Sequence, residues 1–189
     1  MHQKNKLKLL IKKGSADLNS LMPKINKCLF SPYELIAIVP ASTIVGKIQM
    51  LSAAEKAFKA FCSDNAISKN LCLEFLLYLY ATPKIDEALK LASKKDKRYF
   101  LVFGSPCRDL KEMLKCLHEL GFREKSWKLR PNLKKLLAIY KSASKLANNA
   151  TAKKLELAIV EEQAMLRLKH AKAHFEGSSM HASENSASK

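Results

Sequence analysis

The chain has 189 residues and is 48% hydrophobic, which is enough to fill a core and argues against global disorder. Its 34 Lys and Arg residues outnumber its 17 acidic residues, which gives a formal charge of +17 at pH 7. A charge excess of this size favours a polyanionic partner, with nucleic acid first and an anionic membrane second. The alternative is a basic surface that only keeps the protein in solution.

The sequence lacks the marks of a secreted or membrane protein. Residues 1–11 are followed by no small-residue cleavage site, and the longest apolar stretch, 71–81, is too short to span a bilayer. Five cysteines without paired spacing predict reduced, buried thiols in a cytoplasmic protein: Cys28, Cys62, Cys72, Cys107 and Cys116. Because no Cys or His pair has zinc-ligand spacing, we predict no metal site.

The first part of the chain predicts two strands and a short helix. The apolar run at 7–11 indicates a strand that Gly14 ends. Residues 17–22 indicate a short helix that stops before Pro23. A β-branched and apolar run at 34–39 then predicts a buried strand.

Two helices are predicted in the middle of the chain. Gly46 opens a helical pattern whose apolar residues recur at core-facing spacing: Ile48, Leu51, Ala54, Phe58 and Phe61. Ser68 is the predicted N-cap of the next helix, 69–81, which is apolar nearly all round. We therefore expect 69–81 to be the central buried helix of the fold, with Pro83 marking its end.

A strand and another helix are predicted next. Residues 98–103 indicate a strand. Ser105 and Pro106 have the residue types of an N-cap and a first helical position, so a helix is expected over 107–120, with Gly121 as its stop.

The last predicted helix begins at Thr151, its expected N-cap, and ends near His170. Beyond it the composition turns polar and predicts a disordered tail over 176–189. Together these elements predict an α/β fold in which several helices pack a small β-sheet. A single domain is expected over 1–175, the basic segment 1–27 included.

No constellation in the sequence indicates catalysis. Gly46-Lys47 lacks the upstream glycine and the following Ser or Thr of a phosphate-binding loop. His118 has no second helical His with which to bind zinc, and Ser105 lacks the second glycine of a nucleophile elbow. We therefore predict a protein that is not an enzyme and that needs no cofactor.

The basic residues carry the functional signal. Four lysines on or beside the two middle helices are the RNA-binding candidates: Lys56, Lys59, Lys69 and Lys84. Each is also compatible with an ordinary solvated position. Trp127 lies among the many bases of residues 123–145 and either stacks on an unpaired base or anchors the core.

Six segments also resemble, in their order and spacing, a known family: 44–61, 70–79, 85–89, 100–104, 139–144 and 160–166. They are similar to the TPRKB-like small subunits of the KEOPS tRNA-modification complex, including that family's Ile-x-Glu-Ala-hydrophobic pattern at 85–89. Gln49 departs from the His of archaeal-type members, and Pro83 stands at their arginine position with Lys84 after it.

The resemblance implies a non-catalytic subunit of a complex that makes threonylcarbamoyladenosine in tRNA. Such a subunit binds the 3′ CCA end of tRNA and a small kinase-like ATPase, which bridges it to the threonylcarbamoyl-transferase subunit. Three apolar residues near the end of the last helix are the candidate partner interface, with burial in the chain's own core as the alternative: Met165, Leu166 and Leu168.

Two further functions remain open at the level of sequence. One is a general RNA- or ribosome-associated protein without an ATPase partner. The other is a structural adaptor whose charge is incidental.

Overall fold

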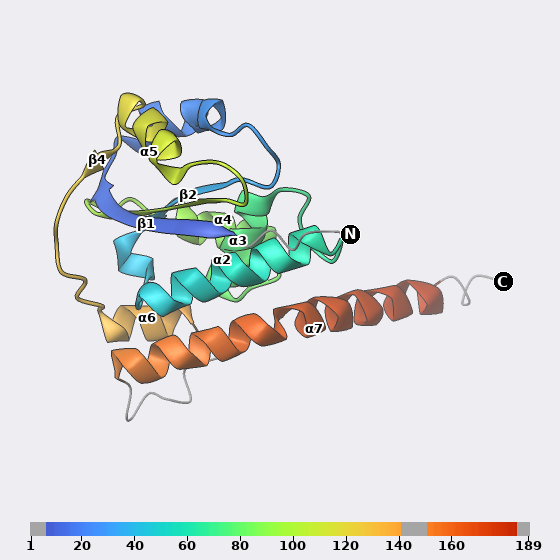
Figure 1. The fold of residues 1–189 in the computed structure, drawn as a ribbon. Coiled ribbons are helices and arrows are strands. Elements are labelled where there is room, and N and C mark those ends of the chain that lie inside the picture. The colour runs from blue at the N-terminus through green and yellow to red at the C-terminus, as the bar shows by residue number, and fades with distance from the viewer. Residues whose placement is uncertain (1–6, 141–150, 185–189) are drawn as a thin grey trace.

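A four-stranded antiparallel sheet in the order β2-β3-β1-β4 forms the centre of the structure (Figure 1). The computed structural model describes residues 7–140 and 151–184, with side chains up to residue 171. The strands are β1 (Lys8–Ser15), β2 (Leu35–Pro40), β3 (Tyr99–Ser105) and β4 (Arg123–Glu124). All residues of β2 and β3 are buried, as expected of apolar runs covered on both faces. The predicted α/β fold is confirmed.

Helices cover both faces of the sheet, so there are two hydrophobic cores. The larger core lies under α2, α3, α4, α6 and α7, and the smaller core lies under α1, η1 and α5 (Figure 1). The bounds are α1 (Leu18–Leu21), η1 (Met22–Cys28), η2 (Ala41–Thr43), α2 (Lys47–Cys62), α3 (Leu71–Tyr80), α4 (Ile85–Ala92), α5 (Leu110–Glu119), α6 (Leu133–Ile139) and α7 (Ala152–Glu184).

Gly14 does not end the first strand, contrary to the prediction. β1 continues through it to Ser15. A Cβ atom at Gly14 would lie 2.3 Å from the Arg123 carbonyl oxygen and 2.5 Å from the Phe122 ring. The glycine therefore lets β4 approach β1 closely, which is a packing role that a sequence pattern does not distinguish from a stop.

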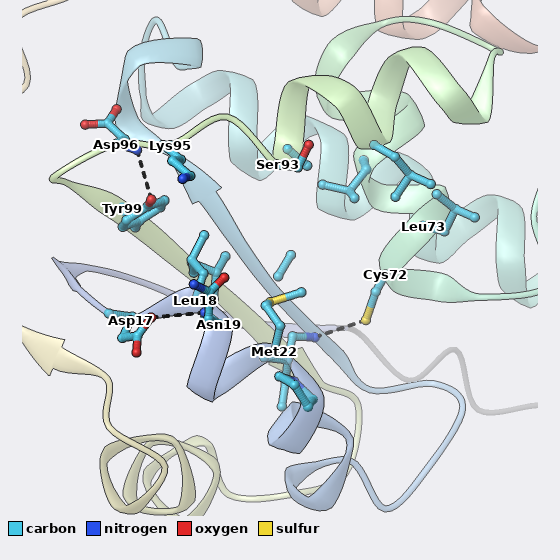
Figure 2. A pocket seen from close by; sticks show the side chains of 18 of the residues that line it. Asp17, Leu18, Asn19, Met22, Cys72, Leu73, Ser93, Lys95, Asp96 and Tyr99 are labelled. Atoms are coloured by element: carbon cyan, nitrogen blue, oxygen red, sulfur yellow. Dashed lines mark hydrogen bonds between the residues drawn. The ribbon is translucent and has the colours of Figure 1, made fainter.

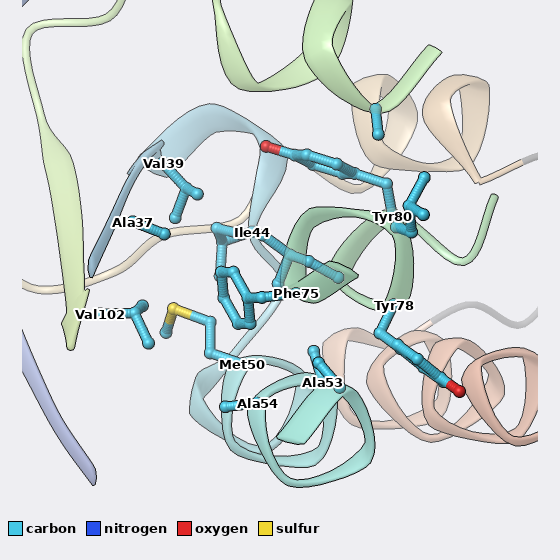
Figure 3. Packing of buried hydrophobic residues seen from close by; sticks show 14 of the residues in the cluster. Ala37, Val39, Ile44, Met50, Ala53, Ala54, Phe75, Tyr78, Tyr80 and Val102 are labelled. Atoms are coloured by element: carbon cyan, nitrogen blue, oxygen red, sulfur yellow. The ribbon is translucent and has the colours of Figure 1, made fainter. Parts of the chain in front are cut away.

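The core-facing side of α2 differs from the predicted stripe. Its buried hydrophobic residues are Met50, Ala53, Ala54, Ala57 and Ala60, and Figure 3 shows the first three beside Phe75 of α3. Ile48 is 54% exposed, so the prediction for it is wrong. Small side chains occupy the deepest positions because they fill the space between closely packed helices without strain.

The central position of α3 is confirmed, but its N-cap is not Ser68. The Asn70 side chain accepts the Leu73 N–H at 3.1 Å, whereas the Ser68 hydroxyl accepts the Asn70 N–H. α3 buries Leu71, Phe75, Leu77, Leu79 and the two tyrosines Tyr78 and Tyr80.

The predicted start of α5 is also wrong. The Ser105 hydroxyl accepts the N–H groups of Cys107 and Arg108, which closes a local turn in place of a helix. The helix begins later, at Leu110, where the Asp109 side chain accepts the Lys111 N–H at 2.9 Å.

Thr151 caps α7 as predicted, since its hydroxyl accepts the Lys154 N–H at 3.3 Å. The predicted end near His170 is wrong, because α7 continues to Glu184. Residues 176–184 of the expected polar tail are therefore helical, and 185–189 lie outside the described residues. No proline interrupts the helix over this length. Within the described residues, no helix is long and apolar enough to cross a bilayer.

The prediction of five reduced, buried cysteines is wrong. Cys28 of η1 and Cys116 of α5 form a disulfide with their Cα atoms 5.9 Å apart. Cys62 and Cys107 are exposed. The sequence separation of 88 residues gave no sign of the pair, because only the packing of η1 against α5 brings the two thiols together.

Candidate functional surfaces

The predicted partner interface on α7 is divided between the core and the surface. Leu166 is fully buried, whereas Met165 is 49% and Leu168 is 63% exposed. Leu157, which the sequence analysis did not single out, is 47% exposed and lies about three turns before Leu168. By helical spacing Leu157, Met165 and Leu168 share one side of α7, and we call these three residues the α7 stripe.

The four predicted RNA-binding lysines have different surroundings. Lys56 is half-buried between α2 and α7, where its ammonium donates to the Ser52 hydroxyl and the Val160 carbonyl. Burial lowers the pKa of Lys56, although Glu55 partly opposes this effect. Lys59 and Lys69 are exposed, and among the described residues neither has an ion-pair partner. The exposed Lys84 forms an ion pair of 3.3 Å with Glu87.

The structure does not bring these lysines into one cluster. Lys59 and Lys69 lie near the turn that joins α2 to α3. Lys84 lies beyond the opposite end of α3, a helix of ten residues and about 15 Å. Two separate positively charged positions, and not one patch, therefore flank the central helix.

A groove with a volume of about 950 Å³ follows the outer edge of β2, as Figure 2 shows. Its walls come from α1 and η1 on one side and from α3 and α4 on the other. At its floor the Ile36 N–H, which points away from β3, donates to the Cys72 sulfur at 3.4 Å. Burial raises the pKa of the Cys72 thiol, so the groove presents a protonated thiol among mainly apolar side chains.

A buried polar network joins the start of α2, the ends of α3 and α6, and the interior of α7. The Gln49 side chain accepts the Val45 N–H and donates to the Leu79 carbonyl and to the Tyr140 hydroxyl. The Gln163 amide of α7 donates to the Gln49 carbonyl at 3.2 Å. Because Gln49 is fully buried, this departure from the family pattern changes the inside of the protein and not a ligand-contacting surface.

Trp127 is half-buried against the larger core. Its ring meets Phe100 edge to face, with ring centroids 5.0 Å apart. Of the two roles expected for Trp127, this contact supports the core anchor.

The described residues hold no group of three or more His, Cys, Asp and Glu side chains arranged to bind a metal.

Comparison with known proteins identifies the family. Residues 14–167 match the sequence model of the family described as kinase binding protein CGI-121. The chain belongs to the CGI-121 family. This membership confirms the resemblance to the KEOPS small subunits.

The matched region runs from the end of β1 into α7, so it contains the buried residues of both cores. No curated protein matches the chain closely enough to count as a relative. The CGI-121 family is one of kinase-binding proteins, and a kinase is therefore the partner class that its description gives.

Proposed function

We propose that this chain is the small, non-catalytic subunit of a cytoplasmic complex that makes threonylcarbamoyladenosine in tRNA. In that complex it binds the 3′ CCA end of tRNA and a small kinase-like ATPase. The ATPase links it to the transferase subunit, which carries out the chemistry. The match of residues 14–167 to a kinase-binding family is the observation that supports this function most directly.

The α7 stripe is the proposed surface for the ATPase. Its three large apolar side chains are about half exposed, on a helix whose other side packs on the core. An exposed apolar strip edged by charged residues is typical of a protein interface. Leu157 and Leu168 extend the interface along α7, and Leu166 acts from beneath by holding the helix on the core.

The exposed lysines on either side of α3 are the proposed tRNA contacts. Lys59, Lys69 and Lys84 have ammonium groups that solvent and phosphate can reach. Lys56 is the least suited of the four, since it is half-buried and its burial disfavours the charged ammonium. The affinity of such contacts falls steeply with salt, because binding to phosphates releases condensed counterions.

A comparison of tRNA variants tests the proposed RNA contact. The purified protein should bind full-length tRNA more tightly than tRNA without its CCA end. The control is tRNA that lacks the same number of nucleotides at its 5′ end. Equal losses would favour general RNA binding, and no binding at low salt would favour a structural adaptor with incidental charge.

A kinetic experiment tests the adaptor role. Holding tRNA for an enzyme raises its effective concentration, so omission of this protein should reduce modification more at low tRNA than at saturating tRNA. The effect should require the kinase-like ATPase, because the ATPase bridges the two ends of the complex. Modification of tRNA by the isolated chain, at a rate that follows its purity, would contradict the proposal.

A further inference from the structure

Cations from separate segments of the chain meet around Trp127. The Lys13 ammonium lies 5.6 Å from the centroid of the indole ring and donates to the Trp127 carbonyl at 3.0 Å. The Arg98 guanidinium lies 5.2 Å from the same centroid. Lys13 is in β1 and Arg98 comes just before β3, so the antiparallel pairing of these strands places both at the same end of the sheet.

A third cation lies beside this pair. The Lys125 N–H donates to the Lys13 carbonyl at 2.9 Å, which extends the pairing of β1 with β4 by one residue. Residues that face each other in this way have neighbouring side chains, and like charges in such positions destabilise a sheet. We call Lys13, Arg98, Lys125 and Trp127 the Trp127 ridge.

The positive charge of the ridge is not ion-paired within the described part of the chain. Among the described residues, no carboxylate forms an ion pair with Lys13, Arg98 or Lys125. The nearest acids in the sequence have other partners. Glu124 forms an ion pair with Lys12 at 2.9 Å, while Asp96 accepts the main-chain N–H groups of Ser42 and Arg98.

The core fixes the position of these charges. Trp127 packs on Phe100 and on the larger core, so the indole is a firm support beneath Lys13 and Arg98. Because Lys13 and Arg98 already lie over the indole ring, the ring is not free to stack on a base. The cations themselves remain available, and the ligand that they suit is a chain of negative charges.

We infer that the Trp127 ridge is a second RNA contact of this protein, which binds the phosphodiester backbone of tRNA away from the CCA end. Phosphates there would relieve the repulsion between Lys13 and Lys125 and would release their own condensed counterions. Contacts of this kind position an RNA without reading its sequence. The inference rests on the proposed function in one respect, namely that the chain binds tRNA.

Two matched double variants test the ridge. Lys13→Gln/Arg98→Gln removes two of its charges. Lys111→Gln/Lys115→Gln removes two exposed charges from α5, on the other face of the sheet, and leaves the same net charge. Thermal melting first shows that both variants are folded, and tRNA affinity is then measured over a range of salt concentrations.

The ridge variant should bind tRNA more weakly at low salt, and its slope of log affinity against log salt should be lower by roughly one to two. The α5 variant should keep the parent slope. Equal effects of the two variants would mean that only net charge matters, and an unchanged slope in the ridge variant would exclude the contact. Either result would overturn the inference.

The same variants separate the ridge from the CCA site. On tRNA without CCA, the ridge variant should lose the same factor in affinity as on full-length tRNA, because the two contacts are distinct. If removing the CCA end did not weaken binding but the ridge substitutions did, the proposed CCA contact would be wrong and the ridge contact would stand. Phosphatidylcholine vesicles with and without phosphatidylserine complete the test. If the ridge variant loses only vesicle binding, the ridge is a membrane contact and the inference is wrong.

Discussion

Leu166 and Leu168 are two positions apart on α7, yet one is buried in the core and the other is exposed. Leu168→Glu should change the free energy of unfolding by no more than about 0.5 kcal/mol. It should also prevent co-purification with the kinase-like ATPase, because a charge would enter the apolar α7 stripe. Leu166→Ala should cost about 2–5 kcal/mol, since it leaves a cavity in the core.

Denaturant unfolding and a pull-down of the ATPase check both variants. The charge control is Lys115→Glu, an exposed position of α5 on the other face of the sheet. A stable Leu168→Glu variant that retains the ATPase would move the interface away from the α7 stripe.

Glu74 makes the stability of the fold depend on pH. It is buried in α3, where one carboxylate oxygen accepts the Ser68 N–H at 2.8 Å and the other has no hydrogen-bond partner among the described residues. Burial raises the pKa of Glu74 above its ordinary value, and the backbone hydrogen bonds and Arg167 only partly offset this. Its contribution to stability is therefore complete below the unfolded pKa and is lost as pH rises through the folded pKa.

Glu74→Gln should remove this loss, because the amide keeps an acceptor for Ser68 and carries no charge to desolvate. Urea unfolding at several pH values measures the effect. The variant should gain stability relative to the parent as pH rises above the ordinary pKa of 4.5. Parallel curves for the two proteins would show that Glu74 does not titrate in this way.

At the scale of elements, the first turn of α2 is capped by α7. The Glu156 carboxylate accepts the Gln49 N–H at 3.0 Å. A Cβ atom on Gly46 would lie 2.2 Å from the same carboxylate oxygen, so the glycine provides the space for this contact. Gly46 has an extended backbone, and its value here is its small size alone.

A double-mutant cycle tests this cap. Glu156→Ala should cost about 0.5–2 kcal/mol, as the loss of a cap does. Gly46→Ala should cost a similar amount by displacing the carboxylate. Because both changes remove the same contact, the double variant should lose less than the sum of the two, as measured by chemical unfolding. Strict additivity would show that Gly46 and Glu156 act independently.

The elements that the sequence predicted well are those with a strong local signal. The apolar runs of β2, β3 and α3 and the threonine cap of α7 are all where their residue types place them. The predictions that were wrong concern residues whose role depends on how separate elements pack together. Alanines form the deepest side of α2, and Gly14 serves as a close contact and not as a stop.

The candidate surfaces were less predictable for the same reason. Leu166 and Leu168 are equally apolar in the sequence. Only the way α7 packs on the core buries Leu166 and leaves Leu168 exposed. Lys56 and Lys59 have the same charge and lie on the same helix, but Lys56 is half-buried and donates to the Val160 carbonyl, whereas Lys59 is exposed. Contacts such as those of Lys13 and Arg98 with Trp127 join distant segments, which no local periodicity encodes.

At the scale of the whole molecule, the disulfide closes a long loop. It joins Cys28 to Cys116 across 88 residues and fastens η1 to α5 over the smaller core. Such a link stabilises a protein mainly by restricting the unfolded chain, typically by about 2–4 kcal/mol. Reduction of the protein should therefore lower its free energy of unfolding by about that amount.

Denaturant unfolding with and without a reductant measures this loss. The variant Cys28→Ala/Cys116→Ala should be insensitive to the reductant, and Cys62→Ser should respond to it as the parent does. Equal stability of the parent in both conditions would mean that the bond does not contribute.

The strand order has a consequence for synthesis on the ribosome. β1 is the first described strand to emerge, yet it lies between β3 and β4. The nascent chain therefore carries β1 and the wholly apolar β2 without their main partner until Tyr99–Ser105 has left the exit tunnel. Pairing over such separations is slow and leaves apolar segments exposed meanwhile. For more than half of its translation, the nascent chain therefore exposes apolar segments that a ribosome-bound chaperone can bind.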